Sequence, residues 1–198
     1  MGPFRKVAAV FYLSLDIEAS GPFPGLFSLV SVGAVPVRRL EGRGAWTPDQ
    51  QDTFYIEVQP LEGAGEIPAA TRVHGLTTDY LKEHGKPPKE ALAEYAAYVQ
   101  RLQRRWGRAL AAGWPASFDA PFIGWYCQKY LGDNPLGYKS FDIGSYAQGL
   151  FRCDRKKVHY RLSEAGLWDS QNPYPHNALT DAIKQAHLLA GLLNSSSL

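Results

Sequence analysis

The feature that most constrains the fold of this chain is a change in hydrophobic period about one third of the way along it. The earlier part contains apolar, Val-rich or alternating stretches at 7–15, 26–38 and 53–58, which are typical of β-strands. The connection at 39–51 is rich in glycine, proline and charge, and it predicts a hairpin. These stretches together predict an antiparallel meander of three strands.

The later part has helical spacing. A long helix is expected at 88–107, because apolar side chains recur there at every third or fourth position. A short apolar strand is expected at 109–114. Further helices are expected at 68–74, 77–83, 120–131, 143–151 and 179–193. The order of elements predicts an α/β fold, in which a mixed sheet of three antiparallel strands and then parallel strands carries helices on both faces.

Composition narrows the classes of function. The 198 residues are 45% hydrophobic and 20% charged, which suits one domain spanning 1–198, with a polar tail at 194–198 that we expect to fray. No apolar run reaches the length of about 20 residues that a membrane span needs, so we expect a cytoplasmic protein without membrane association. The formal net charge of +2 permits nucleic acid as a substrate but does not argue for it.

Two acidic residues stand at the end of the first predicted strand. Asp16 and Glu18 are two positions apart, so both side chains point to the same face where the strand meets solvent. Close carboxylates repel, and a divalent cation resolves that conflict. Oxygen ligands suit hard ions such as Mg²⁺ or Mn²⁺. Taken alone, the pair is better explained as two solvated acids at a strand end.

Two further segments carry acids near the starts of predicted helices. Asp119 follows Phe118 and begins a helix, where capping is a frequent role of aspartate. His176 lies just before the last helix and Asp181 lies in its first turns, so a loop imidazole and a helix carboxylate can border one cleft. Each residue also has an ordinary explanation: a helix cap, a surface histidine, or a carboxylate that complements the helix dipole.

The combination is more specific than its parts. An acidic pair at a strand end, a Phe-Asp pair at a helix start and a histidine five residues before an aspartate of the last helix occur here in one order. In these motifs the chain resembles the DEDDh 3′-5′ exonucleases, which have a ribonuclease-H-like fold, and the resemblance covers about 7–193. The stretch Val73–Thr77 (VHGLT) adds to it. Many members have a Gly-His-Asn-type stretch where this chain has Gly113–Ser117 (GWPAS).

The resemblance implies a hydrolase that removes nucleotides from the 3′ end of single-stranded RNA or DNA and releases 5′-mononucleotides. It implies two ions, Mg²⁺ or Mn²⁺. Asp16, Glu18 and Asp181 would share one ion, with Asp16 bridging to the second. Asp119 would contact an ion or act one shell further out, and His176 would be the general base. A homodimer and a polymerase or other nucleic-acid-processing partner are compatible with this resemblance.

Residues that flank the motifs are candidates for holding the terminal nucleotide. Phe23, Phe118 and Val73 could stack on or wedge the last bases, and core packing is the alternative explanation. The resemblance suggests that Ser28 and His74 contact the terminal sugar.

Two basic clusters are candidates for phosphate binding. The cluster at the end of the long helix is better explained as a solvated face, and it contains Arg101, Arg104, Arg105 and Arg108. The better candidate for gripping a phosphate backbone contains Arg152, Arg155, Lys156, Lys157 and Arg161.

Two other functions remain open. A catalytically inactive nucleic-acid-binding or scaffolding protein could keep this fold, although relics usually lose a metal ligand and this chain has four carboxylates and the histidine. A different metal hydrolase would need grouped His or Cys ligands, whereas the five histidines are scattered. RNA and DNA are not distinguished, because contacts to the 2′-hydroxyl cannot be read from a sequence.

Overall fold

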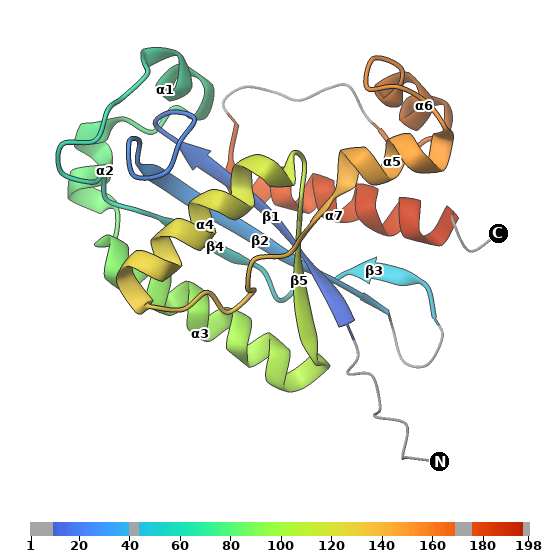
Figure 1. The fold of residues 1–198 in the computed structure, drawn as a ribbon, viewed down its shortest axis with the longest axis horizontal. Coiled ribbons are helices and arrows are strands. Elements are labelled where there is room, and N and C mark those ends of the chain that lie inside the picture. Colours follow the sequence, from blue (N-terminus) through green and yellow to red (C-terminus); the bar gives the residue numbers. More distant parts are fainter. Residues whose placement is uncertain (1–9, 40–43, 169–175, 196–198) are drawn as a thin grey trace.

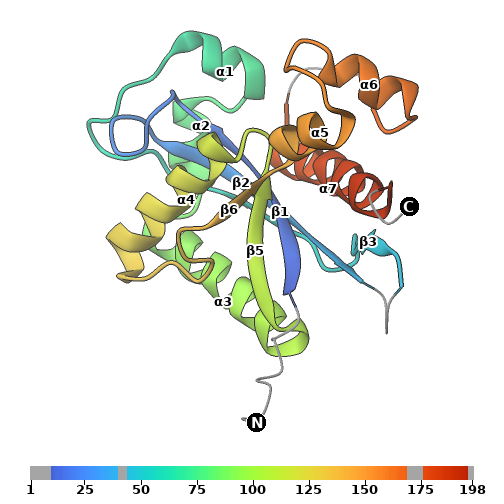
Figure 2. The same ribbon diagram turned by 45° about the vertical axis from the view of Figure 1, so that its right-hand side comes forward.

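The computed structural model describes residues 10–39, 44–168 and 176–195 (Figure 1). A mixed sheet forms its centre, with the strand order β3-β2-β1-β5-β6 and with β4 also paired to β2. The strands are β1 (Val10–Ala19), β2 (Leu29–Arg39), β3 (Trp46–Pro48), β4 (Phe54–Glu57), β5 (Arg108–Gly113) and β6 (Ser140–Asp142). The short strand β6 lies at one edge of the sheet (Figure 2).

Strand β1 joins the antiparallel and the parallel parts of the sheet. It pairs antiparallel with β2, where Asp16 lies opposite Gly33, and parallel with β5, where Leu13 lies opposite Ala111. The predicted architecture of antiparallel strands followed by parallel strands is therefore confirmed. The strands β3 and β6 were not predicted, because three residues are too few to show a period of two.

Helices cover both faces of the sheet, as the sequence predicts (Figure 1). They are α1 (Pro68–His74), α2 (Thr78–His84), α3 (Pro88–Trp106), α4 (Ala116–Leu131), α5 (Ile143–Phe151), α6 (Val158–Glu164) and α7 (Ala178–Ser195). One core lies between the sheet and the helices α3 and α4, and a second core lies between the sheet and the helices α5, α6 and α7. Among the described residues, no helix combines the length and the apolarity needed to cross a membrane.

Two helix boundaries differ by more than one residue from the sequence expectation, and one helix was not expected. Helix α4 begins at Ala116 instead of 120, because the Ala116 backbone N–H donates to the Asp142 carboxylate at 2.9 Å. Helix α6 was not predicted. Helix α7 continues through Asn194 to Ser195, where a frayed tail was expected, because the Asn194 side chain bonds both backbone polar groups of Trp46, at 2.8 and 3.0 Å. The rest of that tail, 196–198, lies outside the described residues.

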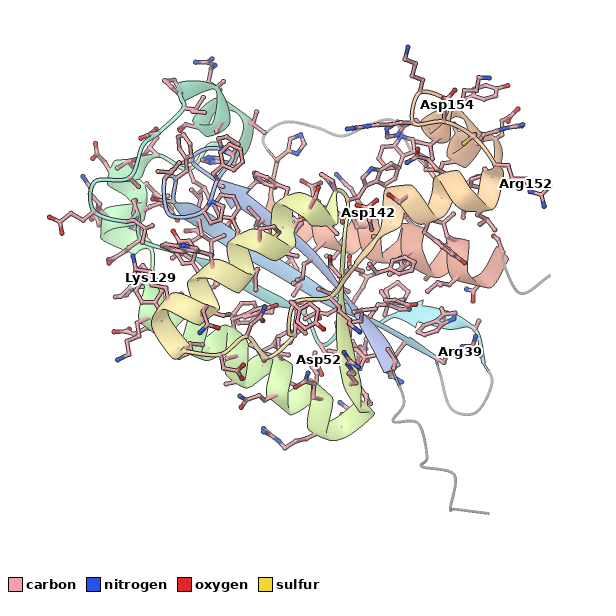
Figure 3. All side chains as sticks on the ribbon, viewed as in Figure 1. Arg39, Asp52, Lys129, Asp142, Arg152 and Asp154 are labelled. Atoms are coloured by element: carbon pink, nitrogen blue, oxygen red, sulfur yellow. The ribbon has the colours of Figure 1, made fainter. Side chains whose placement is uncertain are left out.

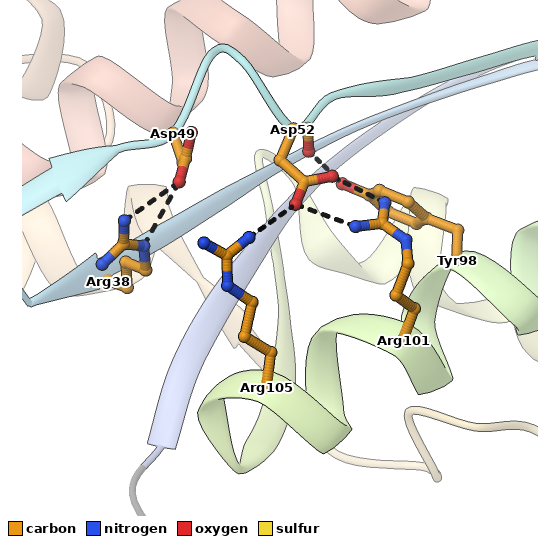
Figure 4. A network of polar contacts seen from close by, with 6 residues as sticks. All are labelled: Arg38, Asp49, Asp52, Tyr98, Arg101 and Arg105. Carbon is orange, nitrogen blue, oxygen red and sulfur yellow. Dashed lines mark hydrogen bonds and ion pairs between the residues drawn. The ribbon is translucent and has the colours of Figure 1, made fainter.

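A polar network ties the end of α3 to the connection between β3 and β4 (Figure 4). The guanidinium of Arg101 donates to both carboxylate oxygens of Asp52, at 2.9 and 2.6 Å, and Arg105 lies 3.7 Å from the same carboxylate. The Tyr98 hydroxyl donates to the Asp52 backbone oxygen at 2.8 Å. The hydrogen bond from Arg101 is the main reason that the pKa of Asp52 lies below its usual value.

Close backbone contact fixes α7 against the sheet. A β-carbon on Gly33 of β2 would lie 2.2 Å from the Ala178 carbonyl oxygen, so only glycine leaves room for the first turn of α7. On β1, the buried Ser14 hydroxyl donates to the Ala182 carbonyl oxygen at 3.0 Å. Both contacts lie close in sequence to Asp181, and they set the position of that carboxylate relative to β1.

Gly33→Ala should therefore push α7 away from β2. We expect a loss of about 1–3 kcal/mol in the free energy of unfolding, the usual cost of overpacking, together with reduced activity. Gly149→Ala is the matched control, because a β-carbon on this α5 glycine meets no atom within 4 Å. Urea unfolding measures both variants. Equal stability of Gly33→Ala and the parent protein would show that α7 is not held by this contact.

Candidate active site

Side chains from three elements meet at the end of β1. Asp16 and Glu18 come from β1, Asp119 from α4 and Asp181 from α7. Ligand atoms of Glu18, Asp181 and the nearby His176 all lie within 4.8 Å of one another, a spacing that suits a shared metal ion. The structure thus brings together residues that are far apart in the sequence.

The strand places its two acids on one face, as the sequence predicts. Leu15 and Ile17 point into the core under α3 and α4, so Asp16 and Glu18 point to the other face. Asp16 is partly buried, and its Oδ1 accepts a hydrogen bond from the side-chain amide of Gln185 at 2.6 Å. Glu18 is buried, with 9% of its surface exposed.

Asp119 bridges α4 and β1. Its Oδ1 accepts a hydrogen bond from the Ile17 backbone N–H at 3.1 Å, and its side chain is buried. Because Asp119 lies inside α4 and bonds to another element, the alternative explanation that it caps this helix is wrong. Its Oδ2 is buried and accepts no hydrogen bond from the described residues. A β-carbon on Gly113 would come within 2.6 Å of this oxygen, so a glycine there leaves room for the carboxylate.

His176 and Asp181 face each other across the start of α7. The imidazole Nδ1 lies 3.3 Å from Asp181 Oδ2, and the His176 backbone N–H donates to the Val73 carbonyl oxygen at 2.8 Å. Asn177 begins the helix, since its Oδ1 accepts from the backbone N–H groups of Leu179 and Thr180 at 3.1 Å each. An asparagine just before a helical pattern is a capping signal that the sequence reasoning missed.

Burial and mutual repulsion raise the pKa values of three of these acids. The pKa of Asp16 lies well above its usual value, first because of burial and then because of Asp119, Glu18 and Asp181. Burial and Asp181 raise the pKa of Glu18 to about 7. Burial is also the main cause that raises the pKa of Asp119 to about 8. These acids cannot all ionise at neutral pH without a compensating positive charge.

The oxygen atoms at this site fit a hard divalent cation. Asp119 Oδ2 is buried and accepts no hydrogen bond from the described residues, and the buried Asp181 Oδ2 has the contact with His176 as its polar neighbour. Leaving the Asp119 oxygen without a partner costs free energy, which a bound cation would recover. The carboxylate oxygens of Asp16 and Glu18 complete a set of ligands that suits Mg²⁺ or Mn²⁺.

Two residues of α7 touch the acids and were missed by the sequence reasoning. Lys184 Nζ lies 3.3 Å from Asp181 Oδ1, and the Gln185 amide is the group that donates to Asp16. They follow Asp181 by three and four positions, which places them on its side of the helix. That spacing was available in the sequence and could have identified them.

The candidate substrate-binding residues divide into two groups. Phe23, Phe118 and Val73 are at least partly exposed, and 63% of the surface of Phe23 is open to solvent. Phe118 also packs against Phe122, with the ring centroids 5.3 Å apart, so the core-packing explanation holds for part of its surface. Val73 contacts the His176 backbone. These three residues stay candidates for holding the terminal nucleotide.

Ser28 and His74 are buried away from the acids. The Ser28 hydroxyl accepts a hydrogen bond from the Leu61 backbone N–H at 2.9 Å, and His74 Nδ1 accepts from the Leu76 N–H at 3.1 Å. Both residues line a cavity of about 370 Å³ to which none of the four acids belongs. Their contact with a terminal sugar stays a prediction.

A known exonuclease resembles this chain in sequence. The chain is 33% identical over 178 residues to the 3′-5′ DNA exonuclease Cap18 of Escherichia coli, covering 89% of this chain and 88% of that protein. No family model matches the chain.

Solved structures share the fold at lower identity. The nuclease domain of 3′hExo, a DEDDh family member bound to rAMP, has a TM-score of 0.71 and 14% identity, covering 96% of this chain and 95% of that one. A full-length 3′-exonuclease has a TM-score of 0.72 and 16% identity, and the match covers 98% of this chain and 64% of that longer one. The identity to Cap18 along nearly the whole chain, together with this fold, shows that the chain belongs to the DEDDh 3′-5′ exonuclease superfamily.

Proposed function

We propose that this chain is a metal-dependent exonuclease that hydrolyses single-stranded DNA from the 3′ end and releases 5′-mononucleotides. The convergence of four carboxylates and His176 at the end of β1 carries this proposal. DNA is favoured over RNA because the relative at 33% identity is a DNA exonuclease. Exonuclease I of E. coli, whose fold is similar with a TM-score of 0.63, has been solved with a dT13 oligonucleotide.

The acids would hold two divalent cations. Asp16, Glu18 and Asp181 would hold one of them, and Asp16 would also contact the second, with Asp119 contacting an ion or acting one shell further out. When bound, such ions lower the pKa of water and stabilise negative charge on a transferring phosphoryl group. The chain itself orients the ligands, because Gln185 holds Asp16 Oδ1 at 2.6 Å.

His176 would accept the proton of the attacking water. An imidazole is a base that is suited to neutral pH, and the contact between Nδ1 and Asp181 Oδ2 orients the ring. The His176 backbone bond to Val73 ties this base to α1. Phe23, Phe118 and Val73 would hold the terminal nucleotide beside it. The alternative of an inactive scaffold is not favoured, because the five site residues are all present and the relative is an exonuclease.

Metal dependence is the simplest test. Hydrolysis of a single-stranded DNA oligonucleotide should stop in excess chelator and return when Mg²⁺ or Mn²⁺ is added in excess, because the acids alone repel the phosphate. Gel analysis of a 5′-labelled oligonucleotide measures this. Unchanged hydrolysis in excess chelator would refute a role for metal ions.

The polarity and the preferred sugar can be tested with matched substrates. A 5′-labelled DNA strand should shorten one nucleotide at a time, whereas a strand with a blocked 3′-hydroxyl should be cut slowly or not at all. We expect an RNA strand of the same sequence to be degraded more slowly. Cleavage of a circular single strand would instead indicate an endonuclease, and faster degradation of RNA would overturn the preference for DNA.

Variants of His176 and Asp181 should lose activity for different reasons. His176→Ala should lower single-turnover rates by about 10²–10⁴-fold, the usual effect of losing a general base, and leave Mn²⁺ affinity nearly unchanged. Asp181→Asn should weaken Mn²⁺ binding and turnover together, since an amide oxygen carries no charge. Calorimetric Mn²⁺ titration and quenched-flow rates separate the two outcomes. Near-native turnover of His176→Ala would remove this residue from the mechanism.

A further inference from the structure

The cluster of acids borders a cavity of about 500 Å³, which is large enough for a nucleotide. Asp16, His176 and Asp181 belong to its wall, and so do two tryptophans, Trp114 and Trp168. Trp114 directly follows β5, and Trp168 lies beyond the end of α6. The cavity is also lined by Leu167, Ile183, Lys184, Gln185, His187 and Leu188. It therefore joins the candidate metal site to an aromatic surface that the proposed chemistry does not use.

Three rings form what we call the aromatic wall: Trp114, His159 and Trp168. The rings of Trp114 and His159 stack with centroids 5.1 Å apart and an interplanar angle of 8°. The ring centroid of Trp168 lies 5.3 Å from that of Trp114 and 4.8 Å from that of His159. A β-carbon on Gly144 would come within 2.6 Å of Trp114 Nε1, so the indole lies directly against α5. The wall is thus a fixed apolar surface, the kind on which nucleobases stack.

A second cavity, of about 440 Å³, lies along the same wall. Trp114 and His159 belong to its lining, together with Arg155. The carboxylate of Asp142 also lines it, and its oxygens accept hydrogen bonds from backbone N–H groups of the α4 and α5 starts, at 2.9 and 2.7 Å. Because Trp114 lines both cavities, a strand that leaves the metal site along this wall arrives beside Arg155.

The turn between α5 and α6 is strongly basic. We call its four exposed cations, Arg152, Arg155, Lys156 and Lys157, the basic corner. None of them forms a close ion pair with another described residue, and the charge of Arg155 also acts electrostatically on the Asp142 carboxylate. The acid of this turn, Asp154, accepts hydrogen bonds from the backbone N–H groups of Lys156 and Lys157 at 3.0 Å each, so it serves to shape the turn. Figure 3 labels Arg152 and Asp154 in this part of the molecule. Apart from the interaction between Arg155 and Asp142, the corner presents positive charge that no close ion pair neutralises within the described part of the chain.

The other candidate cluster of cations, at the end of α3, contains arginines that are paired with an acid. On α3, Arg101 and Arg105 both point to Asp52, and the closest approach is 2.6 Å (Figure 4). Arg161, which follows the basic corner in sequence, is likewise paired, with Glu164 at 3.1 Å. Charge that is paired within the protein contributes less to phosphate binding than charge without a counterion.

We propose that the strand upstream of the scissile bond binds on a track that leads from the metal site along the aromatic wall to the basic corner. Its bases would stack on the wall and its phosphates would contact the corner, the combination that binds single strands without sequence preference. The ligand is thus a single-stranded polynucleotide of several residues. This proposal rests on the proposed exonuclease function and adds the path of the substrate that is not yet hydrolysed.

The double variant Arg155→Ala/Lys156→Ala tests the corner. The substrates are a 20-residue oligothymidylate and the p-nitrophenyl ester of thymidine 5′-monophosphate, which has no upstream nucleotide. The ratio of kcat/KM for the oligonucleotide to kcat/KM for the ester should fall by roughly tenfold, mainly through KM. The slope of log affinity against log salt concentration should decrease by about 0.7 for each phosphate that the variant no longer neutralises.

A matched control removes the same charge elsewhere. Arg104→Ala/Arg108→Ala changes two exposed arginines, one in the last turn of α3 and one at the start of β5. Trp114 follows the other end of β5, so the ratio should stay that of the parent protein. Trp168→Ala tests the wall and should raise KM for the oligonucleotide while leaving the salt slope unchanged, because stacking involves no ion release. An unchanged ratio and salt slope in Arg155→Ala/Lys156→Ala would overturn the track.

A failure of the proposed exonuclease function can be distinguished from a failure of the track. If the parent protein hydrolyses neither substrate, fluorescence anisotropy with the labelled oligonucleotide in excess chelator still measures the track. Weaker binding and a smaller salt slope in Arg155→Ala/Lys156→Ala would then support the track without the exonuclease. Equal binding by this variant, the control variant and the parent protein would refute it.

Discussion

The cost of burying mutually repelling carboxylates at the end of β1 is the constraint on which the rest of the structure depends. Glu18 and Asp119 have pKa values raised to about 7 and about 8, well above those of an unfolded chain. When the protein folds near neutral pH without a cation, these carboxyl groups must therefore either bind protons or remain charged at a cost in free energy. The stability of the metal-free protein should fall as pH rises from about 4 to about 8. A bound cation removes this cost, so one interaction links folding to the candidate chemistry.

The scaffold holds these acids together through contacts of backbone and small side chains. Gly33 and Ser14 bring the first turns of α7 directly against β2 and β1. Asp119 accepts the Ile17 backbone N–H, which ties α4 to the same strand. Asn177 caps α7 one residue after the candidate base. The geometry of the site is therefore set by rigid elements, and the proposed substrate path runs over the turns and rings that surround them.

Local sequence patterns predicted the long strands and helices and identified the acidic residues of the candidate site. The apolar run that becomes β1, the periodic face of α3 and the spacing of Asp16 and Glu18 are all visible over a few residues. Features that depend on distant partners were not visible. Helix α4 begins early because Asp142, 26 positions away, accepts its first N–H, and Gln185 meets Asp16 across 169 positions. The short strands β3 and β6 form because they pair with the neighbouring strands β2 and β5.

The most direct measurement of the central claim compares the parent protein with Asp16→Asn by chemical unfolding, in chelator and with Mn²⁺. Asparagine keeps the oxygen that Gln185 contacts and removes one negative charge. We predict that Asp16→Asn is more stable than the parent protein in chelator, and that Mn²⁺ stabilises the parent protein far more than the variant. A parent protein whose stability does not respond to Mn²⁺, or a variant that is less stable in chelator, would contradict the account.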